Sequence, residues 1–396
     1  MSSQDQWLLP DGIEEVLPPD AWRLERARRE LLDMFARRGY DLIIPPLIEH
    51  LESLLTGTGN DLDLQTFKVT DQLTGRMLGM RADMTPQAAR IDAHPLRRDA
   101  PTRLCYMGSV LHTRADGFGG SRSPMQIGAE LFGHAGIESD TEILELMLET
   151  LALLQISDVH VDLGHVGIFR GLARDAALSA VVENDLFDAL QRKAVAEIDE
   201  MLATHVSDAG QRRRLSALAQ LSGADDVFAR AREVLAGAGA SVIAALDNIE
   251  AIASLLKQRV GDVTLNYDLA ELSGYKYQTG MVFAVFVPGS GREIARGGRY
   301  DAVGEVFGRA RPATGFSTDL KALMSLSGRA FDNDCGAILA PADEDSELHV
   351  MVKDLRQQGE RVVYALPGQA GDAATMECDR VLVKEPGGWV TRPADG

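Results

Sequence analysis

The chain has 396 residues, of which 45% are hydrophobic and 25% are charged, so it can bury a large core in two or three domains. No apolar run approaches the roughly 18 to 20 residues of a membrane span, and the first residues lack the basic flank and apolar centre of a signal peptide. We therefore expect a cytoplasmic protein. Its 40 basic and 59 acidic residues give a net charge of −19, which disfavours tRNA or another polyanion as a ligand.

The first part of the chain combines one helical pattern with two extended patterns. Residues 20–38 carry hydrophobic side chains on one helical face and arginines opposite, which predicts an amphipathic helix that ends at Gly39. Residues 40–47 are rich in β-forming side chains but interrupted by prolines, and they predict a short strand. Residues 66–85 predict a hairpin that turns near residues 73–75.

Two further helices are expected before residue 160. Thr85 followed by Pro86 is typical of a helix N-terminus, because threonine caps the first turn and proline needs no donor there. Residues 139–155 have helical spacing and predict a second helix, with Ser139 or Asp140 as its N-cap.

Between these two helices, residues 103–133 predict a long hairpin. One strand covers residues 104–111, and a second covers residues 126–132. The connection at residues 113–124 is polar and rich in glycine. Glycines permit backbone rearrangement, so we expect a mobile hairpin tip.

The residue pattern of the second half of the chain changes twice, first to a helical region and then to a mixture of strands and helices. Residues 166–255 have helical spacing and few β-branched runs, which indicates an inserted helical subdomain. Strands are expected at residues 263–267 and 280–286, and the last helix of the main domain at residues 317–325. A small C-terminal α/β unit should occupy residues 333–396, with strands at 336–340, 361–365 and 380–383 and a helix at 346–358.

The cysteines and histidines do not form a recognisable metal site. Cys105, Cys335 and Cys378 are widely spaced, which fits neither a disulfide framework nor a CxxC motif. The eight histidines are scattered, so zinc is not expected. We expect no metal and no cofactor.

Three segments occur in the order of one known family: QIGAELFG at 126–133, YQTGMVF at 277–283 and ARGGRYDAV at 295–303. With the N-terminal helix and strand, which resemble the dimer-forming motif 1 of class II aminoacyl-tRNA synthetases, they make residues 8–325 resemble histidyl-tRNA synthetase. This implies an α+β fold, an antiparallel sheet flanked by helices, for residues 1–325, with the helical insertion at about 166–255. Residues 333–396 resemble a truncated form of the family's anticodon-binding domain.

The family binds free histidine between two groups of side chains. For the α-ammonium the resemblance supplies Asp83, Thr85 and Gln126, and for the imidazole it supplies Glu130 and Tyr300. A carboxylate suits each end, because it pairs with an ammonium and accepts a hydrogen bond from an imidazole N–H.

Two positions depart from the family pattern. Asp83 is one methylene shorter than the family's glutamate, and Gln278 stands where the family usually has an imidazole-facing tyrosine. Tyr277 is the neighbouring candidate for that contact. A structural alternative is also open, since Gln126 and Glu130 lie four residues apart and would share the polar face of a solvated strand.

The cations that synthetases use for adenylation are missing. These cations stabilise charge on the α-phosphoryl group and on departing pyrophosphate. The family's three arginines align with His112, Ser273 and Ala322, and the motif 3 glutamate aligns with Lys321. We therefore expect no catalytic residue in this chain. The alternative is that displaced cations replace the phosphate contacts, with Arg114, Lys276 and Lys321 as candidates.

A histidine site without adenylation chemistry resembles the regulatory subunits of ATP phosphoribosyltransferase, which are histidyl-synthetase-like proteins of histidine biosynthesis. That resemblance implies a partner, the short-form catalytic subunit, which joins ATP to phosphoribosyl pyrophosphate in the first step. It also implies L-histidine as feedback effector and a dimer within a hetero-oligomer, a hetero-octamer in the family. The tip between His112 and Met125 is the expected mobile element.

Two other functions remain open at this level. One is an active histidyl-tRNA synthetase with rearranged phosphate contacts. The other is a synthetase-like module that senses uncharged tRNA, which the acidic composition and short C-terminal unit disfavour.

Overall fold

A computed structural model describes residues 7–56, 60–115, 120–270, 274–275, 277–331, 336–369 and 372–394, without the side chains of residues 60 and 61. The chain divides into two compact units, Met1–Arg329 and Ala330–Gly396. No helix of the described part is both long enough and apolar enough to cross a membrane.

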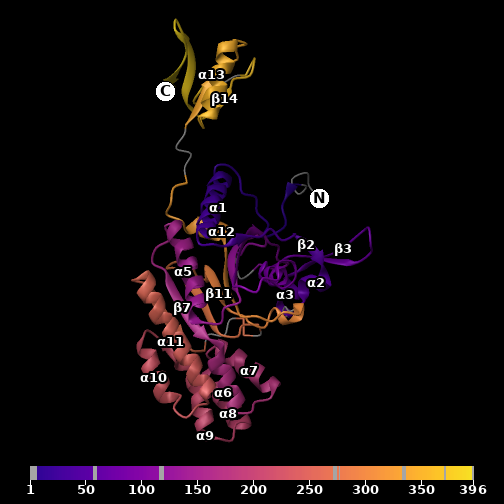
Figure 1. Ribbon diagram of the computed structural model, residues 1–396, viewed down its shortest axis with the longest axis vertical. Coiled ribbons are helices and arrows are strands. Elements are labelled where there is room, and N and C mark those ends of the chain that lie inside the picture. The colour runs from indigo at the N-terminus through magenta and orange to yellow at the C-terminus, as the bar shows by residue number, and fades with distance from the viewer. Residues whose placement is uncertain are drawn as a thin grey trace. The chain divides into compact units, whose positions relative to one another are not determined.

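The first unit is built on a mixed sheet of nine strands (Figure 1). All neighbours are antiparallel except β1 with β5 and β7 with β9, which are parallel. In spatial order the strands are β1 (Asp41–Leu42), β5 (Thr102–Ser109), β6 (Met125–Phe132), β12 (Ala313–Asp319), β11 (Ala295–Arg299), β10 (Met281–Phe286), β7 (His160–His165), β9 (Thr264–Asp268) and β8 (Ser222–Gly223).

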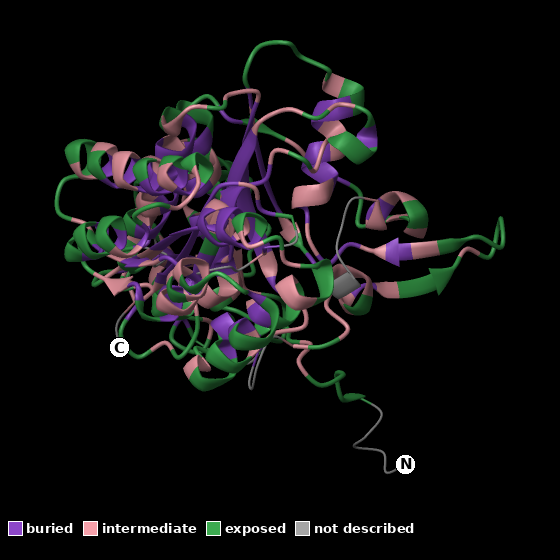
Figure 2. Ribbon diagram, turned by 90° about the horizontal axis from the view of Figure 1, so that it is seen from below, coloured by how far each residue is buried: buried purple, intermediate pink, exposed green. Residues whose placement is uncertain are grey.

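Helices cover this sheet, and a small second sheet stands beside it. Figure 2 shows the large sheet as buried among helices, whereas the β3–β4 hairpin projects and is mostly exposed. The small antiparallel sheet has the order β2 (Ile48–His50), β4 (Met77–Met80) and β3 (Phe67–Thr70). The helices outside the insertion are α1 (Asp20–Arg37), α2 (Leu51–Leu55), α3 (Asn60–Gln65), α4 (Thr85–Ile91) with the π-helical turn η2 (Asp92–Leu96), α5 (Ile137–Leu153) and α12 (Leu320–Leu326).

The helical insertion follows β7 and returns to the sheet at β9. Its helices gather at one end of the first unit (Figure 1), and α11 packs against α5 and α6. They are α6 (Val166–Asp175), α7 (Ala180–Gln191), α8 (Val195–His205), α9 (Ala209–Ala217), α10 (Asp226–Val234) and α11 (Ala240–Val260).

The second unit is a four-stranded sheet with one helix. The strand order is β14 (Arg361–Tyr364), β13 (Ala337–Ala340), β15 (Cys378–Glu385) and β16 (Gly388–Pro393), with α13 (Ser346–Gln357) packed on it. The core contains Ile338, Leu348, Val352 and Leu382. The sequence patterns missed β16, the strand that completes this sheet.

Two predicted helix starts are wrong, and each has a physical reason. Helix α5 begins at Ile137 after Gly136, because the side chains of Ser139 and Asp140 are bonded to Arg299 and do not cap the helix. The helix expected from residue 317 begins only at Leu320, because the preceding residues pair with β6 through Asp319.

Candidate functional site

The centre of the candidate site is the carboxyl group of Glu130 on β6. Glu130 is only 1% exposed, and its Oε1 accepts a hydrogen bond of 2.8 Å from the Tyr106 hydroxyl. The Tyr300 hydroxyl donates to its other oxygen. Burial raises the pKa of Glu130 to about 8, although the hydrogen bonds from both tyrosines oppose the shift. This buried carboxyl excludes the interpretation of β6 as a solvated polar face.

Two glycines make room for this arrangement. Gly315 on β12 pairs with Glu130 in the sheet, and a Cβ at that position would lie 1.5 Å from Glu130 Oε2. Gly128 pairs with Tyr106, and its Cβ would lie 2.5 Å from the Tyr106 hydroxyl. Larger residues at either position would therefore displace the Glu130 cluster, defined here as Tyr106, Glu130 and Tyr300.

The second half of the candidate site joins β6 to the segment before α4. The Gln126 amide donates to Asp83 Oδ1 at 2.7 Å, and its oxygen accepts from the Met84 N–H at 2.9 Å. The Thr85 N–H also donates to Asp83 Oδ1, at 3.0 Å. Among the described residues no group donates to Asp83 Oδ2, and Asp83 is half-buried. This oxygen is suited to pair with an ammonium.

Hydrogen bonds link the two halves of the candidate site into one continuous chain of residues. The Thr85 hydroxyl lies 3.0 Å from the Tyr106 hydroxyl, which in turn bonds Glu130. Because the Tyr106 O–H donates to Glu130, Thr85 is the donor in this contact. Sequence reasoning missed Tyr106; its place on β5, opposite the glycine of QIGAELFG, is the signal that could have found it. The helix-cap interpretation of Thr85 is wrong, since Met84 is the N-cap of α4.

Tyr277 forms no hydrogen bond with Asp83, Glu130 or the residues that connect them in the described structure, and its neighbour is buried. Tyr277 is 44% exposed, whereas Gln278 is 6% exposed and its Oε1 has no hydrogen-bond partner among the described residues. Desolvation nevertheless raises the pKa of Tyr277, and Asp83 adds to the shift. Both residues remain candidates for an imidazole contact.

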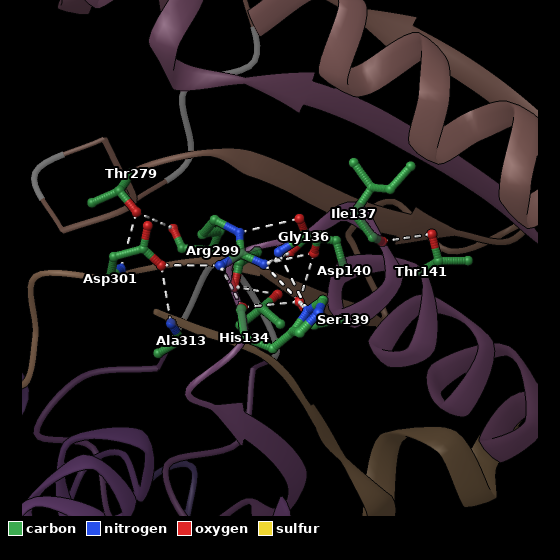
Figure 3. Close-up of polar contacts among 12 residues, drawn as sticks. His134, Gly136, Ile137, Ser139, Asp140, Thr141, Thr279, Arg299, Asp301 and Ala313 are labelled. Carbon is green, nitrogen blue, oxygen red and sulfur yellow. Dashed lines mark hydrogen bonds and ion pairs between the residues drawn. The ribbon is translucent and has the colours of Figure 1, made fainter. Parts of the chain in front are cut away.

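A buried arginine fixes the end of β11, directly before Tyr300 (Figure 3). Arg299 Nε donates to Asp140 at 3.1 Å, and Nη2 donates to the Ser139 hydroxyl at 2.8 Å. Asp301 accepts from Arg299 Nη1 at 3.1 Å and from the Ala313 N–H at 2.9 Å. The ARGGRYD segment therefore consists of strand β11 and the turn that follows it. Its two glycines lie within the strand and do not form a tight turn.

The positions of the missing arginines have other roles where they are described. His112 Nε2 lies 2.9 Å from the Ala82 carbonyl, next to Asp83, so this side chain supports the Asp83 segment. Ala322 lies on α12. Ser273 lies outside the described residues.

The proposed replacement cations differ in their availability. Lys321 Nζ donates to the Ser123 carbonyl at 2.7 Å. Arg114 is exposed and has no ion pair or hydrogen bond among the described residues. Lys276 lies outside them, as do residues 116–119 of the hairpin tip that we expect to be mobile. The described cysteines, Cys105 and Cys378, are buried free thiols, and no group of metal ligands occurs in the described part of the chain.

The chain matches known protein families along most of its length. The family model described as histidyl-tRNA synthetase matches residues 12–323, and the model described as ATP phosphoribosyltransferase subunit HisZ C-terminal domain matches residues 335–392. The ATP phosphoribosyltransferase regulatory subunit of Thioalkalivibrio sulfidiphilus is 59% identical over 97% of this chain and 98% of its own length. That of Pseudomonas putida is 56% identical over 99% of each chain.

Solved structures agree with these matches. The crystal structure of an ATP phosphoribosyltransferase regulatory subunit/histidyl-tRNA synthetase from Bacillus halodurans has a TM-score of 0.83 at 26% identity, over 93% of this chain and 95% of that chain. A histidyl-tRNA synthetase from Nostoc has a TM-score of 0.77 at 17% identity, over 98% and 97%, and shares the fold. The predicted class II fold is confirmed, and the chain belongs to the family of ATP phosphoribosyltransferase regulatory subunits.

Proposed function

We propose that this chain is a non-catalytic regulatory subunit of ATP phosphoribosyltransferase, that it binds L-histidine, and that it transmits feedback inhibition to a short-form catalytic subunit. The first step of histidine biosynthesis would require both subunits. The observation that carries this proposal is the hydrogen-bonded chain from Asp83 to Tyr300, combined with the absence of arginine at positions 112, 273 and 322.

The chemistry of the site supports histidine as the ligand. The free oxygen of Asp83 would pair with the α-ammonium, while Glu130 would accept from an imidazole N–H. Gln126 and Thr85 hold Asp83 and connect it to the Glu130 cluster, so the two ends keep a fixed separation. Gln278 Oε1, which bonds no described residue, offers a further acceptor. Such a site would bind a small zwitterion through both of its ends.

The same residues argue against ligase activity. Loss of one preorganised group can reduce a rate by a hundredfold to a thousandfold, and here three arginines are replaced. His112 is bonded to Ala82, and Lys321 is bonded to Ser123. Arg114 alone among the described candidates has no partner, and bidentate arginine geometry is not easily reproduced from another backbone position.

Inhibition would follow from linkage between two arrangements of the complex. Histidine must favour one arrangement, and the catalytic subunit must be active in the other. If histidine bound both arrangements of the complex with equal affinity, it would leave the activity unchanged. We propose that the hairpin tip between His112 and Met125 is the moving element, because it connects the strands that carry Tyr106 and Gln126. Unchanged hydrogen exchange of this tip on addition of histidine would exclude it.

The decisive experiment mixes the purified chain with the short-form catalytic subunit from the same organism. Phosphoribosyl transfer is measured for each protein alone and for the mixture, with and without L-histidine. We expect activity only in the mixture, and inhibition by histidine that is lost with Glu130→Gln. A mixture no more active than the catalytic subunit alone contradicts the proposal. Histidine-dependent exchange of pyrophosphate into ATP by this chain would instead identify an active synthetase.

A further inference from the structure

An open cavity lies in the helical insertion, between α6 and α11. Its volume is about 440 Å³, within the range of small-molecule sites. It shares no residue with the candidate histidine site. The lining residues are mostly polar or small, and the charged ones are arginines: His165, Gly167, Arg170, Gly171, Arg174, Ser241, Ala244, Ala245, Asn248 and Thr279.

The close approach of the two helices shapes this cavity. A Cβ at Gly171 would lie 2.6 Å from Val242 Cγ2, and one at Gly167 would lie 2.8 Å from His165 Cε1. Arg170 and Arg174 lie four residues apart on α6, so both guanidinium groups project from one helical face. The helices are therefore packed tightly at the glycines, while the arginines line the open part.

The two arginines leave positive charge at this cavity. Arg170 Nη2 donates to the carbonyl oxygens of Tyr275, at 2.8 Å, and Gln278, at 3.2 Å, but it has no carboxylate partner among the described residues. The Arg174 side chain has no ion pair or hydrogen bond among the described residues. The nearby carboxylate of Asp175 accepts from the Gly239 N–H at 2.7 Å. Two arginines without a carboxylate in the lining are unexpected in a chain with a net charge of −19.

His165 supplies a further hydrogen-bond donor at the cavity. His165 is 9% exposed, and its Nδ1 accepts from the Gly167 N–H at 3.0 Å. Burial, assisted by Arg299, lowers the pKa of His165 to about 4, so the ring is neutral at pH 7. With Nδ1 as acceptor, the proton of the neutral ring is on Nε2. This N–H has no acceptor among the described residues.

We propose that the cavity between α6 and α11 binds a small anion through a phosphate or carboxylate group. The two guanidinium groups supply charge, and His165 Nε2–H is a neutral donor without a partner. Ser241 and Asn248, on the facing helix, add polar groups that bond no described residue. A cation would be repelled, and an apolar ligand would leave these donors unsatisfied.

The test measures anion binding to the full chain by isothermal titration calorimetry at constant ionic strength. Pyrophosphate represents a phosphate ligand and citrate represents a carboxylate ligand. We expect saturable binding of at least one of them, with one site per chain. Ala244→Glu should abolish it by placing a carboxylate in the cavity, and Arg174→Ala should weaken it about tenfold.

Arg213→Ala is the matched control, because Arg213 is an exposed arginine of the insertion outside the cavity. It should bind as the wild type does. Circular dichroism checks that each variant is folded. The proposal is overturned if neither anion saturates, if Ala244→Glu binds normally, or if Arg213→Ala weakens binding as much as Arg174→Ala. This readout does not involve histidine, so its outcome is separate from that of the proposed function.

Discussion

At the scale of single residues, Glu130 combines a structural role with a proposed binding role. Its carboxyl group accepts hydrogen bonds from the hydroxyls of Tyr106, on β5, and Tyr300, directly after β11. A carboxylate offers about four lone-pair positions, so two tyrosines leave capacity for a third donor. The same group can therefore organise the site and accept an imidazole N–H.

Glu130→Gln should weaken histidine binding by about tenfold to a hundredfold. The substitution keeps the size of the side chain but replaces an acceptor oxygen with an amide NH2 group, and a buried hydrogen-bonding group left without its partner costs about 1–3 kcal/mol. Isothermal titration calorimetry with L-histidine measures the change. Glu138→Gln, an exposed glutamate on α5, is the control. Equal affinity of wild type and Glu130→Gln would show that Glu130 does not contact the ligand.

The raised pKa of Glu130 predicts that the histidine-free protein loses stability as pH increases. The folded protein binds this proton up to about pH 8, whereas the unfolded chain releases it near the ordinary value of 4.5. The folded state thus holds more protons between these values, and the free energy of unfolding contributed by Glu130 falls as pH rises through 8.

Urea unfolding between about pH 5 and pH 9 tests this prediction. The free energy of unfolding of the wild type should fall more steeply with pH than that of Glu130→Gln, which cannot titrate. His165, whose pKa is lowered to about 4, titrates alike in both proteins and cancels in the comparison. Parallel curves would contradict a raised pKa at Glu130.

At the scale of elements, the site depends on how closely β6 and β12 approach. Gly315 stands opposite Glu130, so the strand pairing leaves space for the carboxyl group only because this residue has no side chain. Arg299 then holds β11 against α5 through Asp140 and Ser139. The neighbouring strands thereby fix Tyr300 beside Glu130.

Gly315→Ala should lower the free energy of unfolding by about 1–3 kcal/mol and weaken histidine binding. The new Cβ would lie 1.5 Å from Glu130 Oε2, so the carboxyl group must leave its tyrosine partners. Gly291→Ala is the control, because its Cβ would contact nothing within 4 Å. If Gly315→Ala and Gly291→Ala have the same free energy of unfolding and the same affinity for histidine, the site tolerates this displacement.

Much of the fold and part of the site were predictable from the sequence. Helical periodicity predicted α1 and the insertion, and the order of QIGAELFG, YQTGMVF and ARGGRYDAV indicated the class II sheet. The pattern could not show that Ser139 and Asp140 bond Arg299, since that contact joins residues about 160 apart. Tyr106 was missed for the same reason, because only strand pairing brings it to Glu130.

At the scale of the whole molecule, the first unit exposes apolar side chains on its N-terminal elements. Strand β1 ends the nine-strand order and pairs only with β5, so its other edge is unpaired in the described chain. Ile44, just beyond β1, is 83% exposed, and Leu42 and Trp22 are also exposed. An unpaired edge beside exposed apolar residues favours association with another chain. The dimer implied by the motif 1 resemblance would cover this surface.

Ile44→Glu should therefore convert a dimer of this chain to monomers, because a buried unpaired carboxylate would oppose the interface. Sedimentation velocity over a concentration series measures the change. Val181→Glu introduces the same charge at a residue that is 70% exposed on α7, and it should leave the dimer intact. A dimer that persists in Ile44→Glu, or that is lost equally in Val181→Glu, would exclude the N-terminal surface as the contact. Loss of the dimer in Ile44→Glu alone would assign this surface to self-association, and would leave the helical insertion free to contact a different subunit.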